Sequence, residues 1–149
     1  MEKTLHLLLA DEDRNDCLLF NKALMQIPIP TKLKTVHDGE QLIKHLLKSA
    51  ERKPDLLFLD FNIPCKNGSE CLSEIKKNKK LKNIPVVVYS TTLHGDIASF
   101  LYEQGAHYYI QKMGFIELKL TLHRILNTLL KNDFERPSKK NFIFNIVEV

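Results

Sequence analysis

Polar side chains that can carry out chemistry follow four apolar stretches of this 149-residue chain. Carboxylates come after two of these stretches, a hydroxyl after the third and an amine after the last. Carboxylates within a few ångströms of one another repel unless a cation neutralises them, and such hard oxygen ligands suit Mg²⁺. The residues are Asp11, Glu12 and Asp13 after the first stretch, Asp60 after the second, Ser90 after the third and Lys112 after the fourth.

A carboxylate is an established nucleophile for forming an acyl phosphate. A phosphoryl group on Asp60 would have oxygens for a metal ion, for the Ser90 hydroxyl and for the Lys112 ammonium group. Phosphoryl transfer needs little from a protein beyond such positioning and charge neutralisation. We therefore predict phosphoryl chemistry at Asp60 if the fold brings these side chains together.

Five short apolar runs are typical of strands that are buried on both faces, which predicts a parallel sheet. Five amphipathic segments alternate with them and are predicted to be helices. Asp13 and Asp38 are placed to cap the first two helices, and Gly105 to end the fourth. The predicted strands are 5–10, 33–36, 56–61, 86–89 and 108–111, and the predicted helices are 14–25, 40–47, 69–78, 96–104 and 115–130.

A strand–helix unit repeated five times predicts an α/β fold, a three-layer α/β/α sandwich with right-handed crossovers. With the parallel strand order 2-1-3-4-5, the first and third strands are neighbours. Ligands of such sheets bind outside the carboxyl ends of the strands, where the strand order reverses. Asp11, Glu12 and Asp60 should then face one another across that point.

Four segments carry a resemblance to a known family. They are LLLADED at 7–13, DLLFLDFNIPCKNG at 55–68, IPVVVYST at 84–91 and GAHYYIQK at 105–112. Each segment alone is a weak signal, but all four occur in order at strand ends. The sequence closely resembles the receiver domains of two-component response regulators, which implies a CheY-like, flavodoxin-like (βα)5 fold.

The resemblance implies a role for each polar position. Asp60 would accept a phosphoryl group from a sensor histidine kinase or a phosphotransfer protein. Asp11, Glu12 and Asp60, with the backbone carbonyl of Asn62, would hold Mg²⁺, and Lys112 would pair with the phosphate. The remaining roles are a switch formed by Ser90 and Tyr109, and tuning of self-dephosphorylation by Asn62 and Thr92.

The family resemblance also implies a switch that is read by other proteins, rather than an enzyme. An unknown downstream protein would bind the surface formed by the fourth helix, the fifth strand and the fifth helix. A homodimer through that surface or through the C-terminal tail is a further expectation. The sequence departs from the family at Glu12, where aspartate is usual, and at Met113, where proline is usual.

Two alternative functions stay open at this point. A phosphohydrolase of the haloacid-dehalogenase type also uses a nucleophilic aspartate with a hydroxyl, a lysine and paired acids, but its acid pair comes last in the chain. A degenerate receiver would bind partners without phosphorylation. At the residue level, Tyr109 is as well explained by core packing as by a switch, and the acids at 11–13 could simply cap a helix.

Length and composition limit the remaining possibilities. The chain suits one domain, predicted as a receiver at 1–131 with a C-terminal extension at 132–149. The β-prone end of that extension, 142–149, is expected to dock on a sheet edge. Three unpatterned cysteines, no signal peptide and no apolar run of about 18 residues predict a cytoplasmic chain without a membrane partner. The mildly basic net charge of +4 and the lysine run at 76–80 do not make nucleic acid an expected partner.

Overall fold

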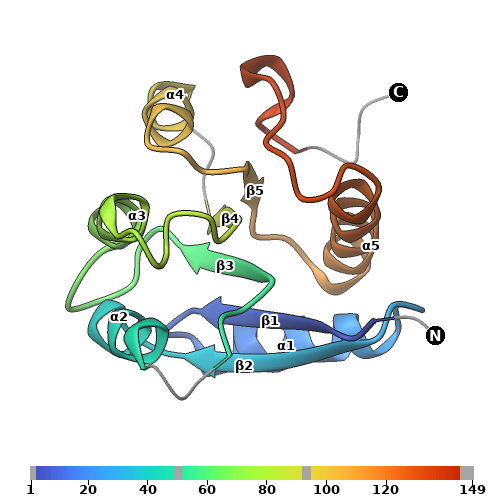
Figure 1. Cartoon of the computed structure of the whole chain (residues 1–149). Coiled ribbons are helices and arrows are strands. Elements are labelled where there is room, and N and C mark those ends of the chain that lie inside the picture. The colour runs from blue at the N-terminus through green and yellow to red at the C-terminus, as the bar shows by residue number, and fades with distance from the viewer. Residues whose placement is uncertain (1–2, 49–51, 92–94, 145–149) are drawn as a thin grey trace.

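The computed structural model describes residues 3–48, 52–91 and 95–144. A parallel sheet with strand order β2-β1-β3-β4-β5 lies between two layers of helices (Figure 1). The strands are β1 (Leu5–Ala10), β2 (Thr31–Val36), β3 (Leu56–Asp60), β4 (Val86–Ser90) and β5 (Tyr108–Gln111). The helices are α1 (Arg14–Met25), α2 (Gly39–Leu47), α3 (Gly68–Lys77), α4 (Gly95–Glu103), α5 (Phe115–Lys131) and the 3₁₀ helix η1 (Lys139–Asn141). The predicted fold class, strand order and elements are confirmed.

The largest difference from the predicted boundaries is at β2. The predicted strand begins at 33, but β2 begins at Thr31, where the backbone already pairs with Leu5 of β1. This start is set by the neighbouring strand, because Thr31 and Lys32 carry no apolar signal of their own. The other boundaries differ from the prediction by at most one residue, which is ordinary at element ends.

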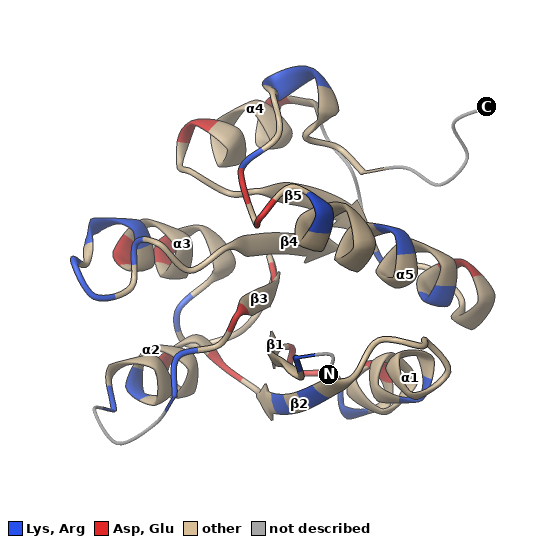
Figure 2. Cartoon of the chain, turned by 45° about the vertical axis from the view of Figure 1, so that its right-hand side comes forward, with Lys and Arg blue, Asp and Glu red and all other residues tan. Residues whose placement is uncertain are grey.

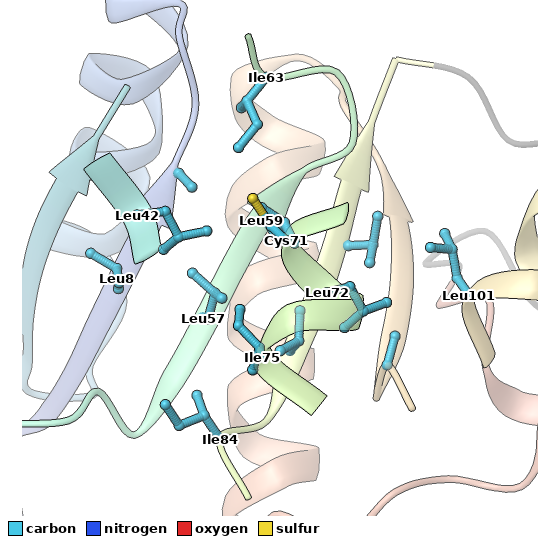
Figure 3. Packing of buried hydrophobic residues seen from close by; sticks show 14 of the residues in the cluster. Leu8, Leu42, Leu57, Leu59, Ile63, Cys71, Leu72, Ile75, Ile84 and Leu101 are labelled. Atoms are coloured by element: carbon cyan, nitrogen blue, oxygen red, sulfur yellow. The ribbon is translucent and has the colours of Figure 1, made fainter. Parts of the chain in front are cut away.

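The sheet divides the apolar side chains into two cores. Residues of α2, α3 and α4 pack on one face, where Leu42 and Leu72 are fully buried (Figure 3). Residues of α1 and α5 pack on the other face, where Phe20 meets Phe58 with ring centroids 4.9 Å apart. Because β1, β3 and β4 are covered on both faces, their continuous apolar runs follow from burial.

The predicted helix caps are present. The Asp13 carboxylate accepts hydrogen bonds from the backbone N–H groups of Asn15 and Asp16 at 2.9 and 3.1 Å. Asp38 accepts one from the N–H of Gln41 at 2.8 Å. These caps satisfy N–H groups that have no partner inside the helix. They also fix the first turns of α1 and α2 next to the carboxyl ends of β1 and β2.

The C-terminal segment 132–144 folds back over α4 and β5 (Figure 1). The N–H of Tyr109 donates to the carbonyl of Phe142 at 3.1 Å, and the N–H of Phe144 donates to the carbonyl of Tyr109 at 3.0 Å. Ile143 therefore pairs in parallel with Tyr109 at the outer edge of β5. The expected docking of the tail is confirmed for 142–144, and 145–149 lie outside the described residues.

Side chains anchor the same segment upstream of this pairing. The guanidinium of Arg136 donates to the carbonyls of Ala106 and Tyr102 and stacks over the Tyr102 ring at 4.1 Å. A ring nitrogen of His107, Nε2, lies 3.0 Å from the carbonyl oxygen of Phe134. These contacts tie the extension to the α4–β5 connection at several points.

His107 gives the fold a testable pH dependence. Burial, together with the positive charges of Lys76 and Arg136, lowers the pKa of His107 from 6.5 to about 4. The folded state therefore favours the neutral ring. The contribution of His107 to the free energy of unfolding should be fully present above pH 6.5 and should be lost as the pH falls from 6.5 to about 4. We expect this residue to account for a loss of about 3 kcal/mol over that range.

Urea unfolding of the wild type and of His107→Gln at pH 7, 5 and 4 measures this contribution. The difference in unfolding free energy between the two proteins should shrink as the pH falls. Parallel pH profiles would show that the protonation of His107 does not limit stability.

Lysine and arginine positions colour β2 and the turn after α3 blue in Figure 2. Most of the lysines at 76–80 are exposed, as expected for a solvated face. Lys76 differs, because its ammonium group donates to the carbonyls of Lys82 and Ile84 at 3.1 and 2.9 Å. Burial lowers the pKa of Lys76 to about 8. This lysine therefore helps to fix the turn before β4.

Within residues 3–48, 52–91 and 95–144, every helix is too short or too polar to cross a lipid bilayer.

Candidate functional site

The predicted site residues gather at the carboxyl ends of four neighbouring strands. Asp11 directly follows β1, and Asp60 is the last residue of β3, which pairs with β1. Ser90 is the last residue of β4, and Lys112 directly follows β5. Because parallel strands end at the same sheet edge, the register of the sheet brings these residues together.

Lys112 forms the centre of a charged cluster. Its ammonium nitrogen lies 2.9 Å from Asp11 Oδ2, 2.9 Å from Asp16 Oδ2 and 3.0 Å from Asp60 Oδ2. The Asp11 side chain is fully buried, and those of Asp60 and Lys112 are 7% and 13% exposed. The three N–H donors of the ammonium group thus face three carboxylates at once.

The sequence prediction missed Asp16. This residue lies three residues after the capping Asp13, so it resembles an ordinary acidic residue in a first helical turn. Its position in the sequence puts it at the same end of α1 as the capping Asp13. Only the direction of α1 relative to β5, however, brings its carboxylate within 2.9 Å of Lys112.

The two strand-end carboxylates are held in the same way. Asp11 Oδ1 accepts a hydrogen bond from the N–H of Asp13 at 2.9 Å, and Asp60 Oδ1 accepts one from the N–H of Asn62 at 3.0 Å. Their second oxygens face Lys112. Each carboxylate is therefore oriented by the backbone two residues further on, with the other oxygen available at the site.

Burial dominates the electrostatics of the cluster. It raises the pKa of Asp11 to about 6, although the contacts with Lys112 and the N–H of Asp13 oppose the shift. Burial alone would lower the pKa of Lys112, but the contacts with Asp11, Asp16 and Asp60 outweigh it and raise this pKa. Lys112 therefore stays charged, and the cluster carries excess negative charge at neutral pH.

This arrangement fits a divalent cation, although no three acidic, histidine or cysteine side chains in the described part of the chain are already arranged to hold a metal ion by themselves. Asp11 and Asp60 provide two carboxylates, and Mg²⁺ is usually held by one or two carboxylates together with waters and phosphate oxygens. Asp11 Oδ2 is buried and lacks a well-directed hydrogen bond among the described residues, although it faces Lys112. Such a buried anionic oxygen is a natural cation ligand.

The other predicted residues occupy different environments. Glu12 and Asn62 are exposed at the mouth of the site, next to Asp11 and Asp60 respectively. Thr92 lies outside the described residues. The structure therefore places the Asp11–Asp60–Lys112 centre in direct contact and leaves the proposed roles of the other three residues as predictions.

The two predicted switch residues are buried on adjacent strands. Ser90 is 2% exposed and Tyr109 is 1% exposed. Tyr109 lies opposite Val88 in the β4–β5 register, and the carbonyl of Ser90 accepts a hydrogen bond from the N–H of Lys112 at 2.6 Å. The backbone of β4 and β5 thus connects both switch residues directly to the charged cluster.

The departure at Met113 does not remove Lys112 from the site, since its three ion pairs are formed. The Met113 side chain turns toward α5, where its sulfur accepts a hydrogen bond from the hydroxyl of Thr121 at 3.3 Å.

On the other side of the site, Gly68 begins α3 against the end of β3. A Cβ at this glycine would lie 2.6 Å from the Cα of Phe61, so a side chain there would displace the Asp60 loop.

The model of one known family matches this chain. The response regulator receiver domain matches residues 7–122. The chain belongs to the response regulator receiver family. This receiver therefore has the fold and the phosphorylation-dependent role in two-component signalling that the sequence resemblance implied, and the match is to the receiver family rather than to a phosphohydrolase.

Relatives and solved structures support the same membership. Response regulator Rcp1 of Synechocystis sp. is 34% identical over 110 residues, which cover 71% of this chain and 75% of Rcp1. The phosphorylated cyanobacterial phytochrome response regulator RcpA superposes with a TM-score of 0.79 at 31% identity, covering 87% of this chain and 96% of that one. The Mn²⁺-bound form of Rcp1 gives a TM-score of 0.77 at 29% identity, with coverages of 90% and 99%. Receivers of this family work with histidine kinases or phosphotransfer proteins, bind a divalent cation at the phosphorylation site, and in general are not enzymes in their own right.

Proposed function

We propose that Asp60 of this receiver accepts a phosphoryl group from a sensor histidine kinase or a phosphotransfer protein. The observation that supports this most strongly is the 3.0 Å contact between Asp60 Oδ2 and Lys112 Nζ at the carboxyl edge of the sheet, beside Asp11. An ammonium group so close to a carboxylate neutralises the charge that would otherwise repel an incoming phosphoryl group.

In the proposed transfer, a carboxylate oxygen of Asp60 forms a bond to phosphorus while the phosphorus–nitrogen bond of a phosphohistidine breaks. The bonding electrons leave on the imidazole, which takes up a proton. Lys112 holds the phosphoryl oxygens, and the Ser90 hydroxyl turns toward them. The N–H of Asn62 keeps the attacking carboxylate oriented during the step.

Asp11, Glu12, Asp60 and the backbone carbonyl of Asn62 would hold Mg²⁺. Bound there, the ion supplies charge neutralisation for the carboxylates and the phosphoryl oxygens. Asn62 and Thr92 are proposed to tune the lifetime of the phosphoryl group. The receiver would act only as an acceptor with self-catalysed transfer and slow dephosphorylation.

The output is a change of surface. Reorientation of Ser90 and Tyr109 would alter the face of α4, β5 and α5, which an unidentified downstream protein or a second copy of the chain would read. The protein would then exist in two conformations, which differ in the orientation of Ser90 and Tyr109. Phosphate can shift the equilibrium between these conformations only by binding one of them more tightly. We place this activity in the cytoplasm, with residues 1–131 as the receiver and 132–149 as its extension.

Incubation with Mg²⁺ and radiolabelled acetyl phosphate tests the proposal. The wild type should gain a hydroxylamine-labile phosphate, and Asp60→Asn should gain none, because an amide is not a competent nucleophile here. Asp55→Asn is a matched control, since it makes the same change immediately before β3, at the opposite end of the same strand. Label that persists in Asp60→Asn would contradict the assignment, and a wild type that stays unlabelled would favour the degenerate receiver.

A further inference from the structure

Only two of the three carboxylates in contact with Lys112 belong to the proposed metal site. Asp11 and Asp60 are proposed to hold Mg²⁺, whereas Asp16 has no place in that ligand set. The Asp16 carboxylate is nevertheless as close to the ammonium group as that of Asp11, at 2.9 Å. The same lysine is therefore held partly by metal ligands and partly by an independent anion.

We propose that Asp16 is a positioning residue, which retains the Lys112 ammonium beside Asp60 when a divalent cation occupies Asp11 and Asp60. This inference rests on the proposed function, because it assigns a supporting role at the same site. Asp16 does not touch the reacting atoms in this proposal and acts only through Lys112.

Electrostatics explain why such a residue is needed. A dication bound by Asp11 and Asp60 neutralises two of the three anions that attract Lys112, and it also repels the ammonium group directly. The long, flexible stem of a lysine would then let its head move into solvent. Asp16 is the remaining carboxylate in contact with Lys112, and it keeps its charge outside the metal ligand set.

Asp16 is well placed for this task because its backbone is rigid. Its N–H donates to the Asp13 carboxylate at 3.1 Å, which fixes the first turn of α1. Its side chain is 34% exposed, so it reaches the site from the rim rather than from the buried centre. A rim carboxylate can hold the ammonium group while leaving the space between Asp11 and Asp60 to the cation.

A simpler role for Asp16 is the favourable effect of any acid in a first helical turn. The two roles differ in whether Asp16 acts through Lys112, and a double-mutant cycle measures that dependence. Asp13→Asn is a matched control, because it removes the same charge from the same turn, and asparagine caps a helix as well as aspartate does.

The first experiment measures the affinity for beryllofluoride, a mimic of the phosphoryl group, in saturating Mg²⁺. We expect Asp16→Asn to weaken binding about fivefold, Asp13→Asn to weaken it much less, and Asp16→Asn to have no further effect in a Lys112→Met background. An equal effect of Asp16→Asn in both backgrounds would overturn the proposal, as would no effect in the wild-type background.

The second experiment needs neither phosphate nor its mimic. The lysine ammonium signals of ¹⁵N-labelled protein report how well each group is shielded from exchange with water, and Lys112→Met assigns the signal of Lys112. We expect this signal in the wild type both with EDTA and with Mg²⁺. In Asp16→Asn it should persist in EDTA, where Asp11 and Asp60 still hold the lysine, and disappear in Mg²⁺.

A Lys112 signal that stays protected in Asp16→Asn with Mg²⁺ would refute the positioning role. The two experiments also separate this inference from the proposed function. If the wild type is neither labelled by acetyl phosphate nor binds beryllofluoride, the proposed function fails, and the ammonium signals in Mg²⁺ still decide whether Asp16 retains Lys112.

Discussion

Lys112→Met is expected to lower the free energy of unfolding in EDTA at pH 7 by about 3 kcal/mol. The substitution leaves the buried carboxylates of Asp11 and Asp60 without the cation that now lies within 3.0 Å of both. Removing one partner of a buried ion pair is costly, because the remaining charge is neither solvated nor paired. For a domain of this size, the melting temperature should fall by about 10 °C.

Mg²⁺ should restore much of this loss, because it neutralises the same carboxylates. Thermal unfolding of the variant in EDTA and in Mg²⁺ gives the comparison, and the rise in melting temperature should be larger than for the wild type. Lys77→Met is the matched control, since Lys77 is exposed on α3. A loss of stability that is the same with and without Mg²⁺ would show that the carboxylates are not a shared site for lysine and metal.

Phe142→Ala is expected to lower the free energy of unfolding by about 3 kcal/mol. The Phe142 ring is 2% exposed, and its centroid lies 5.3 Å from that of Tyr102 and 6.2 Å from that of Tyr109. Truncation removes these ring contacts and leaves a cavity beside β5. The loss of unfolding free energy cannot exceed the free energy needed to detach the C-terminal segment from the rest of the fold. A segment that has lost its anchor can open locally while the rest of the protein stays folded.

Urea unfolding measures the global effect, and hydrogen exchange at the Tyr109 amide measures the local one. That amide donates to the carbonyl of Phe142, so its exchange should accelerate in the variant. Ile143→Ala is the control from the same segment, because Ile143 is 39% exposed. Equal losses for the two variants would contradict the anchoring role of the Phe142 ring.

The sequence by itself determined the fold and the centre of the site. Continuous apolar runs that alternate with amphipathic segments indicate a parallel sheet covered on both faces. In such a sheet every strand ends on the same side, and the strand order 2-1-3-4-5 makes β1 and β3 neighbours, so the residues that follow these strands converge. The sequence alone therefore predicts that Asp11, Asp60 and Lys112 lie close together.

Only the tertiary structure decided which additional groups reach that centre. Asp16 joins Lys112 because of the angle at which α1 crosses the sheet, and a local pattern carries no information on that angle. The contact of Phe142 with Tyr109 depends on the open edge of β5, about thirty residues earlier in the chain. Lys76 looks like part of a solvated run but fixes a turn. In each case the partner is distant in sequence and becomes a neighbour only when the elements pack.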